Sequence, residues 1–288
     1  MKGVVEMIFG ILGGDLRYKF LYEMLTNENF TVYSYNNKYI ENKDNINNLD
    51  EFLDKIDILI APIPFTKDNK NVFNIENENI NIKELIEKTI KFKIKAFFGG
   101  IINKDIIKTL EENNIKTFDF FEDNSIAILN AIPTAEGAIQ TAMENSFKTI
   151  FNSNCLVLGY GRCGKILANM LKGIGANVDV TYRKDEDFAY INTYGLNSIN
   201  LYKIKDSINK YDFIFNTIPY EILNKEILDY INKNTIIIDL ASAPGGVDYN
   251  YARELNLQAI YCPSLPGRVA PYTAGEILKD KIISFLDI

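Results

Sequence analysis

Three glycines in the middle of the chain have the spacing of a loop that binds a nucleotide. Gly159, Gly161 and Gly164 lie in the run LGYGRCGK, between an apolar stretch at 154–158 that predicts a strand and a stretch at 165–171 that predicts a helix. In such a loop the first glycine permits a tight turn, the second lets the backbone approach a pyrophosphate, and the third lets the helix pack closely on the strand. The helix N-terminus adds N–H groups that suit the anion. The pattern predicts a dinucleotide site, with a purely structural turn as the alternative. The expected contacts are Gly159, Tyr160, Gly161, Arg162, Cys163 and Gly164.

The end of the next predicted strand bears on the choice between NAD and NADP. NAD enzymes usually carry an acid there, which binds the ribose 2′-hydroxyl. In this chain Asp179 lies too early, inside the strand, and the tip holds Thr181, Arg183 and Lys184. Two cations suit a 2′-phosphate, so these three residues are expected to bind the cofactor, and NADP is predicted over NAD. The alternative is that Arg183 and Lys184 are only solvated surface charges.

Polar residues also follow two later predicted strands. Asn216, Thr217 and Pro219 close one of them. Ligands of doubly wound sheets lie beyond the carboxyl ends of the strands, so these residues are expected to flank the nicotinamide side of the cofactor. A strand ended by proline with a polar cap is the alternative.

Asp239 ends the next apolar run, where burial would raise its pKa and make it a candidate acid or base. A hydrogen-bonded structural role is equally open. Ser242 and the glycine pair after it offer a hydroxyl and backbone N–H groups to an anionic ligand.

Charged and hydroxyl side chains at other turns are candidates for binding a carboxylate. Arg268 lies in a turn-rich stretch and is a natural bidentate partner for a carboxylate, with a surface arginine as the alternative. Thr273 is expected to cap the last helix. Arg17 follows a glycine pair at a predicted strand–helix junction, which favours an anion. Thr134 and Glu136 open a predicted long helix and are expected to face a cleft, unless they only cap that helix.

Composition excludes several classes of function. The chain has no histidine, which excludes Ser-His-Asp and Cys-His catalytic sites and histidine-ligated zinc. Its three cysteines have no metal-binding spacing and are too few for a disulfide framework. The net charge of −7 argues against nucleic acid as a partner. No apolar run approaches the length of a membrane span. With so few cysteines, a cytoplasmic protein with reduced thiols and no metal site is expected.

Apolar runs alternate with helix-like stretches along all 288 residues, which predicts βαβ units and parallel sheets. The alternation is interrupted at 134–151, where one long helix is predicted because Pro133 would end any earlier helix and Thr134 can cap a new one. The predicted fold class is α/β, with two doubly wound parallel-sheet domains joined by this helix. The first domain is expected to be flavodoxin- or Rossmann-like and the second Rossmann. The expected boundaries are 1–132 for the first domain, 133–152 for the linking helix, 153–271 for the dinucleotide-binding domain and 272–288 for a last helix that packs back towards the first domain.

Six motifs together resemble the family of dipicolinate synthase A subunits from spore-forming bacteria, over essentially the whole chain. They are GGDLR at 13–17, PTAEGAI at 133–139, LGYGRCGK at 158–165, NTIP at 216–219, DLASAPGGVD at 239–248 and LPGRVAPYTAGEIL at 265–278. The last two are the specific ones, because the glycine loop alone fits many dehydrogenases. The plan of two domains and a long linking helix is also similar to that of D-2-hydroxyacid dehydrogenases and adenosylhomocysteinase.

The resemblance implies oxidation of a dihydrodipicolinate species, derived from the hydroxylated tetrahydro intermediate of the lysine pathway, to dipicolinate with hydride transfer to NADP. It implies a flavoprotein-like B subunit as partner and the mother cell of a sporulating bacterium as location, and a homo-oligomer is expected. Because the product ring is aromatic, modest acid/base help suffices. Asp239 and Glu136 are then the acid/base candidates. The candidates for holding the substrate carboxylates are Arg268, Ser242, Thr273, Thr134 and Arg17.

Two other functions stay open at this point. One is a different NAD(P)-dependent dehydrogenase of the same architecture, although the absence of histidine counts against the usual 2-hydroxyacid mechanism. The other is a nucleotide-binding protein that is inactive without its partner. A turnover assay with and without the partner separates this last function from the oxidation of dihydrodipicolinate.

Overall fold

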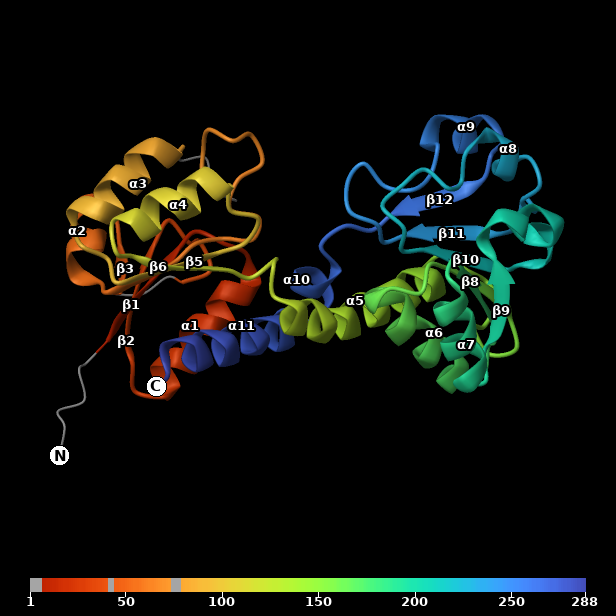
Figure 1. Ribbon diagram of the computed structural model, residues 1–288, viewed down its shortest axis with the longest axis horizontal. Helices are drawn as coiled ribbons and strands as arrows, with labels where there is room; N and C mark the ends of the chain where they lie inside the picture. Colours follow the sequence, from red (N-terminus) through yellow and green to blue (C-terminus); the bar gives the residue numbers. More distant parts are fainter. Residues whose placement is uncertain (1–6, 41–43, 74–78) are drawn as a thin grey trace. The chain divides into compact units, whose positions relative to one another are not determined.

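The computed structural model describes residues 7–40, 44–73 and 79–288. The chain divides into two compact units (Figure 1). Unit 1 comprises Met1–Ala127 together with Ala270–Ile288, and unit 2 comprises Ile128–Val269. The last helix therefore belongs to the same unit as the N-terminal half of the chain.

In its described residues, unit 1 forms a six-stranded parallel sheet with the strand order β3-β2-β1-β4-β5-β6. Its strands are β1 (Ile8–Leu12), β2 (Thr31–Tyr35), β3 (Asn45–Ile46), β4 (Ile58–Ile60), β5 (Ala96–Gly99) and β6 (Lys116–Asp119). Its helices are α1 (Leu16–Asn27), α2 (Leu49–Lys55), α3 (Ile82–Lys91), α4 (Lys104–Glu112) and α11 (Pro271–Leu286). With all six strands, this order is that of the Rossmann fold. If the two-residue strand β3 is left out, the remaining five strands have the flavodoxin order. The flavodoxin- or Rossmann-like fold expected for this unit is therefore confirmed.

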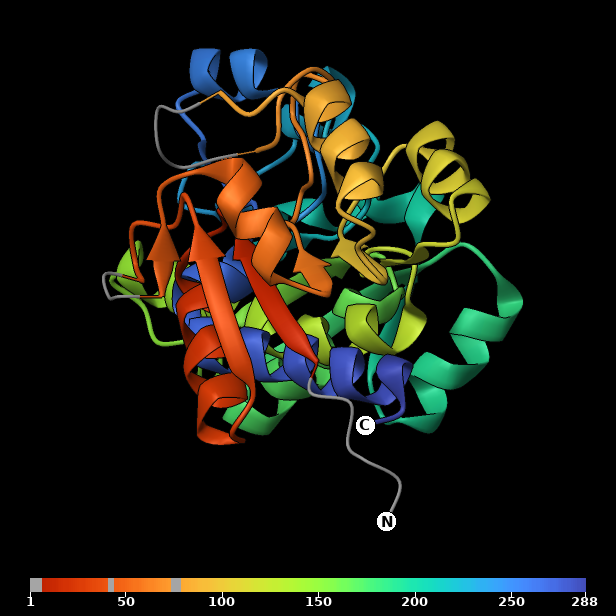
Figure 2. The same ribbon diagram turned by 90° about the vertical axis from the view of Figure 1, so that its left-hand side faces the viewer.

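Helices cover both faces of the unit 1 sheet. α1 and α11 lie side by side on one face, and α2, α3 and α4 lie on the other (Figures 1 and 2). Side chains of β1 pack on both faces of the sheet. Phe9 and Ile11 pack with α1 and α11, whereas Leu12 packs on the opposite face, with α2, α3 and α4. Gly275 lets the two helices approach, because a Cβ there would stand 2.7 Å from the carbonyl oxygen of Arg17.

Unit 2 repeats the same topology. Its parallel sheet has the order β12-β11-β10-β7-β8-β9, which is 3-2-1-4-5-6 when counted from its own first strand, as in dinucleotide-binding sheets. The strands are β7 (Asn154–Leu158), β8 (Asn177–Tyr182), β9 (Asn197–Asn200), β10 (Phe213–Asn216), β11 (Ile236–Asp239) and β12 (Gln258–Tyr261). The helices are α6 (Arg162–Ile174), α7 (Asp185–Thr193), α8 (Lys225–Leu228), α9 (Tyr249–Glu254) and α10 (Leu265–Val269), and α5 (Asn124–Glu144) runs from unit 1 into unit 2.

Alternating residues of β7 divide the core of unit 2 into two layers. Cys155 and Val157 pack with α5, α6 and α7, whereas Leu156 and Leu158 pack on the side of α8 and α9 (Figure 1). All four side chains are fully buried. A parallel strand covered on both faces reads as a continuous apolar run, which is why this strand was predictable.

The long helix α5 differs from the prediction at both ends. It was expected at 134–151 but spans Asn124–Glu144, with Pro133 inside it. Thr134 is therefore no cap, and its hydroxyl donates instead to the carbonyl of Asn130, 2.7 Å away. Proline removes one helical N–H group and crowds the preceding turn, but Pro133 is buried and the apolar face continues through Ala135 and Ala138 into the core. Burial of that face outweighs the tendency of the proline to end the helix.

The last helix also begins earlier than expected. α11 starts at Pro271, with Ala270 in the cap position, so Thr273 lies inside the first turn and does not cap the helix. Proline is well suited to the first helical position, since its N–H group is not needed there and its φ is already helical.

Two absences among the described residues bear on function. No helix in this part of the chain is both long and apolar enough to cross a membrane. Nor do three or more carboxylates or thiols gather there to hold a metal ion.

Candidate functional site

The glycine loop connects β7 to α6 as the spacing predicted. Gly159 has a φ of +97°, which the left-handed turn requires and L side chains rarely adopt. A Cβ on Gly164 would clash with the carbonyl oxygen of Gly159, so the start of the helix can approach the turn only with glycine there. Around Gly161, by contrast, nothing lies within 4 Å of a Cβ. Gly161 is also the N-cap of α6 and provides no side-chain cap to the first turn.

Two threonines from neighbouring strand ends hold this loop in place. The Gly159 N–H donates to Thr181 Oγ1 at 2.8 Å, and the Thr217 hydroxyl donates to the carbonyl of Leu158 at 2.8 Å. Thr181 is only 1% exposed. It therefore lies behind the glycine loop and supports it, whereas the sequence placed it among the residues that contact the cofactor.

The tip of β8 carries the two predicted cations on its surface. Arg183 and Lys184 are exposed and immediately precede α7, whose first turn holds three acids. A third cation lies near the loop. Lys165 Nζ is 5.1 Å from the ring centre of Tyr160 and 5.5 Å from that of Tyr190. Sequence reasoning missed Lys165, although its position directly after the third glycine was a signal that could have found it.

These residues fit a bound dinucleotide. The open space at Gly161 is the place where a pyrophosphate approaches the first turn of a helix in such folds. Next to it, the Tyr160 hydroxyl is buried and has no hydrogen-bond partner among the described residues. Burial raises the pKa of Tyr160, so its hydroxyl keeps its proton. Burial likewise raises the pKa of Cys163, so that thiol is not activated by the helix end.

The carboxyl ends of β10 and β11 form the second part of the site, and β10 lies beside β7, where the strand order reverses. Asn216 and Asp239 lie opposite each other in the ladder, and both are fully buried. The Asp239 carboxylate accepts four hydrogen bonds, from Asn216 Nδ2 (2.8 Å), the Ala241 N–H (3.1 Å), the Gly246 N–H (2.7 Å) and the Tyr249 hydroxyl (2.6 Å). Burial and the bond to Asp239 raise the pKa of Tyr249 well above its ordinary value.

This network holds the loop after β11 against the end of β10. A Cβ on Gly246 would clash with Asn216 Nδ2 and stand 2.8 Å from the carbonyl of Ile218, so this glycine is required sterically. Ser242 is exposed on the loop, and Pro219 is exposed after β10. Of the two roles left open for Asp239, the four donors around it favour the structural one. Sequence reasoning did not identify Tyr249, which no spacing rule connects to Asp239.

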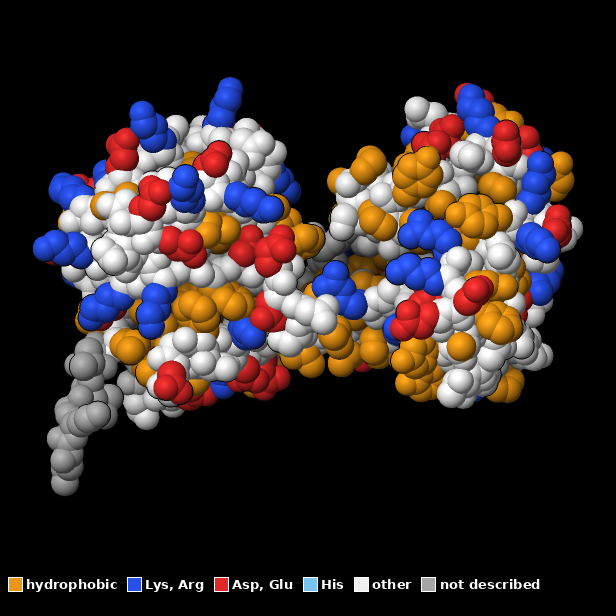
Figure 3. Space-filling view, in the orientation of Figure 1, with side chains coloured by type: hydrophobic (Ala, Val, Ile, Leu, Met, Phe, Trp, Pro, Cys, Tyr) orange, Lys and Arg blue, Asp and Glu red, His pale blue; other side chains and the backbone are white. Residues whose placement is uncertain are grey.

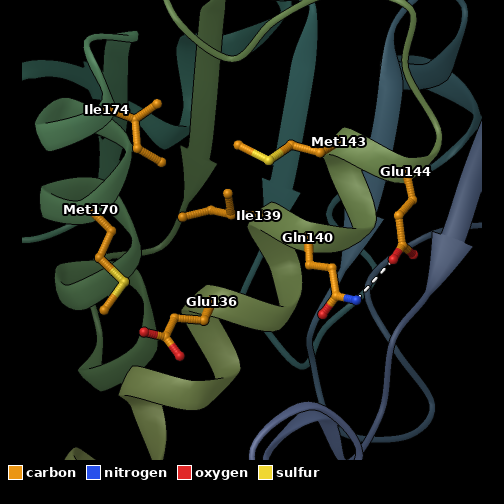
Figure 4. Close-up of a pocket in the computed structure, with 7 residues that line it drawn as sticks. All are labelled: Glu136, Ile139, Gln140, Met143, Glu144, Met170 and Ile174. Carbon is orange, nitrogen blue, oxygen red and sulfur yellow. Dashed lines mark hydrogen bonds between the residues drawn. The ribbon is translucent and has the colours of Figure 1, made fainter.

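The remaining candidates in unit 2 lie on α5 and α10. Glu136 lines a groove with Met143, Met170 and Ile174, the last two from the second half of α6 (Figure 4). In Figure 4 the Glu136 carboxylate lies at the Met170 end of this groove, away from Ile174. Arg268 is exposed on α10. That helix packs on α5 at Gly137, where a Cβ would stand 3.1 Å from Leu265 and Val269.

Two candidates belong to unit 1. Arg17 is 8% exposed, and its guanidinium binds Asp15 in a bidentate pair, with Nε–Oδ1 at 2.8 Å and Nη2–Oδ2 at 2.7 Å. Its Nη2 also donates to the carbonyl of Ile63 at 3.2 Å, which ties the loop after β4 to the start of α1. The charge predicted to attract an anion is therefore already paired. Thr273 is exposed in the first turn of α11.

Comparisons with known proteins agree with this geometry. Residues 8–121 match the family model for the N-terminal domain of the dipicolinate synthase A subunit, and residues 149–253 match that of the acetohydroxy acid isomeroreductase NADPH-binding domain. The A subunit of dipicolinate synthase from Bacillus subtilis is 33% identical over 96% of this chain and 94% of its own length. The crystal structure of the corresponding dipicolinate synthase protein from Bacillus halodurans has a TM-score of 0.87 and 30% identity, covering 98% of each chain.

A more distant similarity bears on the fold alone. D-lactate dehydrogenase from Escherichia coli has a TM-score of 0.65 at 13% identity and covers 98% of this chain and 97% of its own. This likeness agrees with the expectation that the plan of two domains and a long linking helix is similar to that of D-2-hydroxyacid dehydrogenases. Identity of 33% across nearly the full length of both chains, together with the match to the N-terminal family model, places this chain in the family of dipicolinate synthase A subunits, as an NAD(P)-dependent oxidoreductase.

Proposed function

We propose that this chain oxidises dihydrodipicolinate to dipicolinate, with NADP as the hydride acceptor. The observation that carries the proposal is the glycine loop of unit 2, with open space at Gly161 and a buried, unpartnered hydroxyl on Tyr160, in a chain of this family. The overall change is balanced, because the ring loses one hydride to NADP⁺ and one proton to solvent and becomes aromatic. The aromatic product provides the driving force, so strong acid/base catalysis is unnecessary.

NADP, when bound, supplies the electrophilic nicotinamide carbon that takes the hydride. The part played by the chain is to hold and orient it. The first turn of α6 would receive the pyrophosphate at Gly161, while Thr181 and Thr217 keep the loop in the required shape. The Asp239 network would keep Asn216 and the loop bearing Ser242 rigid beside the nicotinamide. Rigid supports of this kind reduce the cost of ordering the reactants.

The preference for NADP over NAD rests on the cations near the tip of β8. Arg183 and Lys184 are exposed there, and no acid occupies the tip itself. The match of this unit to an NADPH-binding family model supports the same choice. Competition binding of the two cofactors tests it, since NADP should bind more tightly and lose that advantage in Arg183→Ala.

The substrate carries two carboxylates, and the residues that would hold them stay predictions. The candidates are Arg268, Ser242, Thr273, Thr134 and Arg17. We assign Asp239 to positioning because all four of its hydrogen bonds come from donors of the protein. Water can then accept the ring proton. Glu136 as acid or base stays a prediction, which the rate of a Glu136→Gln variant decides.

A second type of chain is part of the proposal. The family name designates the A subunit of an enzyme, which implies a partner, and we propose a flavoprotein-like B subunit in the mother cell of a sporulating bacterium. The same observation favours a second candidate function, a nucleotide-binding protein that is inactive alone. One experiment distinguishes the two.

That experiment generates the precursor in place. Pyruvate and aspartate semialdehyde are condensed by the lysine-pathway synthase, and the purified chain and NADP are added with and without the flavoprotein-like partner. NADPH and dipicolinate appearing in equal amounts with the chain alone would support the oxidoreductase, and activity only with the partner would support the second candidate. Dipicolinate formation no faster than spontaneous oxidation in both cases would refute the function. The substrate contact is tested by Arg268→Lys, which keeps the charge but loses the planar fork and should raise KM without changing the Kd for NADP.

A further inference from the structure

Few buried contacts hold helix α7 to the rest of unit 2. Of its nine described residues, Asp185–Thr193, Ile191 is the one that is buried. Phe188 and Tyr190 are 45% and 47% exposed, and Tyr194, directly after the helix, is 55% exposed. Figure 3 shows hydrophobic side chains at the surface over this helix. A segment with so little buried area opens easily, so other contacts must fix its place.

Two lysines of α6 contact α7, which lies beside it in unit 2 (Figure 1). Lys165 Nζ is 5.5 Å from the ring centre of Tyr190 on α7. Seven residues further along α6, Lys172 Nζ donates to the carbonyl of Tyr194, 2.7 Å away. Residues seven apart lie on one face of a helix. The same face of α6 therefore holds α7 at two points, and Lys165 holds the point that is nearer in the chain to the tip of β8.

Lys165 also contacts the glycine loop. Its Nζ is 5.1 Å from the ring centre of Tyr160, which lies between the first two glycines of the loop. Tyr160 is 6% exposed and packs in the same buried cluster as Ile191. An ammonium group over the face of a tyrosine is attracted to the ring. One cation therefore joins a buried residue of the glycine loop to an exposed residue of α7.

The tip of β8, which carries the cations expected to select the cofactor, is attached to α7. Arg183 and Lys184 lie at this tip, and Lys184 is the N-cap residue of the helix. Just before them, the ring of Tyr182 packs on that of Phe188 in α7, with the ring centres 5.2 Å apart. The place of α7 beside the glycine loop therefore sets where the two cations lie.

We propose that Lys165 is a positioning residue for the choice of cofactor. Through the ring of Tyr190 it keeps α7, and with α7 the cations of the β8 tip, in place beside the glycine loop. NADP depends on this position because its 2′-phosphate meets the two cations, whereas NAD carries a hydroxyl group there. The inference rests on the proposed binding of NADP at this loop. It assigns part of the selection to a residue that acts through α7 and not on the phosphate itself.

Calorimetric titration of the full chain with NADP and with NAD tests this role. Lys165→Met removes the charge and should reduce the ratio of the two affinities about 3-fold, the effect of losing one exposed cation–π contact. Lys165→Arg should restore the ratio, because a guanidinium also stacks on aromatic faces. Lys172→Met is the matched control, since it releases the far end of α7 and should leave the ratio unchanged. Circular dichroism and melting temperature confirm that each variant is folded.

A Tyr190→Leu variant distinguishes positioning from direct contact with the phosphate. It removes the ring but keeps the charge of Lys165, so it should lower the ratio as Lys165→Met does. Hydrogen exchange without cofactor gives an independent readout, because the amides of α7 should exchange faster in both variants than in the wild type.

Three results would overturn the inference: a wild-type affinity ratio in Lys165→Met, a ratio lowered in Lys165→Met but not in Tyr190→Leu, or unchanged exchange of α7 in both variants. A chain that binds neither cofactor would refute the proposed function together with this inference. Tight binding of NADP with a wild-type ratio in Lys165→Met would refute this inference alone.

Discussion

Replacing Asp239 with asparagine is expected to destabilise unit 2 without removing a reacting group. Oδ1 accepts from Asn216 and Ala241, and Oδ2 accepts from Gly246 and Tyr249, at 2.6 to 3.1 Å. An asparagine keeps one acceptor oxygen and turns an NH₂ group towards two of the four donors. Two bonds to a charged acceptor are then lost, each worth about 1.5–3 kcal/mol. Allowing for relaxation of the Tyr249 hydroxyl, we expect a loss of about 3 kcal/mol in the free energy of unfolding.

The assay is thermal and urea unfolding followed by circular dichroism, together with calorimetric titration of NADP. For a unit of this size a loss of about 3 kcal/mol lowers Tm by about 6–12 °C. The Kd for NADP should rise as well, because the loop that we propose to lie beside the nicotinamide loses its anchor. Tyr249→Phe is the matched control, since it removes one donor and leaves three, and it should cost only about 1 kcal/mol. If Asp239→Asn melts like the wild type while kcat collapses, the positioning role is refuted and the acid/base role is restored.

The other predictions follow from the same contacts. Thr181→Val is expected to raise the Kd for NADP about 5-fold or more by releasing the Gly159 N–H, and Thr181→Ser, which keeps the acceptor, should restore binding in the same titration. Gly164→Ala should abolish cofactor binding in calorimetry, because the added methyl meets the Gly159 carbonyl; binding at wild-type affinity would contradict this packing. Arg183→Ala should reduce affinity for NADP and leave that for NAD unchanged, as read by competition. Burial and the Asp239 hydrogen bond raise the pKa of folded Tyr249, so above pH ~10 the unfolded chain loses a proton that the folded chain keeps and stability falls as pH rises. Tyr249→Phe should reduce that alkaline loss, measured from urea midpoints on both sides of this pH.

Local patterns were sufficient for the elements that position the cofactor. The apolar run of β7, the glycines after it and the helix of α6 are all read from neighbouring residues, and each appears where it was predicted. The short strand β9 was missed, since Asn197–Asn200 contains only one apolar residue and is recognised as a strand only by pairing with β8. The long helix was misplaced because the rule for Pro133 is local, whereas the burial of Ala135 and Ala138 is not.

The residues of the candidate site divide in the same way, into those that local spacing predicts and those whose contacts depend on the whole fold. Gly159 and Gly164 were assigned from spacing alone, and their φ angle and close contacts agree with the assignment. Thr181 was assigned to the cofactor because it lies at a strand tip, but the direction of its side chain is set by the neighbouring loop. Arg17 looked like a free cation in sequence, and only the folded chain shows that Asp15 pairs with it.

The sequence by itself determined the class of this protein, namely two doubly wound α/β units, a glycine loop for a dinucleotide, and membership of a family through six motifs. These features depend on residues close together in the chain, where periodicity and glycine spacing act directly. Only the tertiary structure shows which donors surround Asp239, because Asn216, Gly246 and Tyr249 reach it from separate segments. It also decided which apolar side chains, Phe147 foremost, stay outside the core. The burial of a side chain and its hydrogen-bond partners depend on the whole fold, and no local pattern of residue types encodes them.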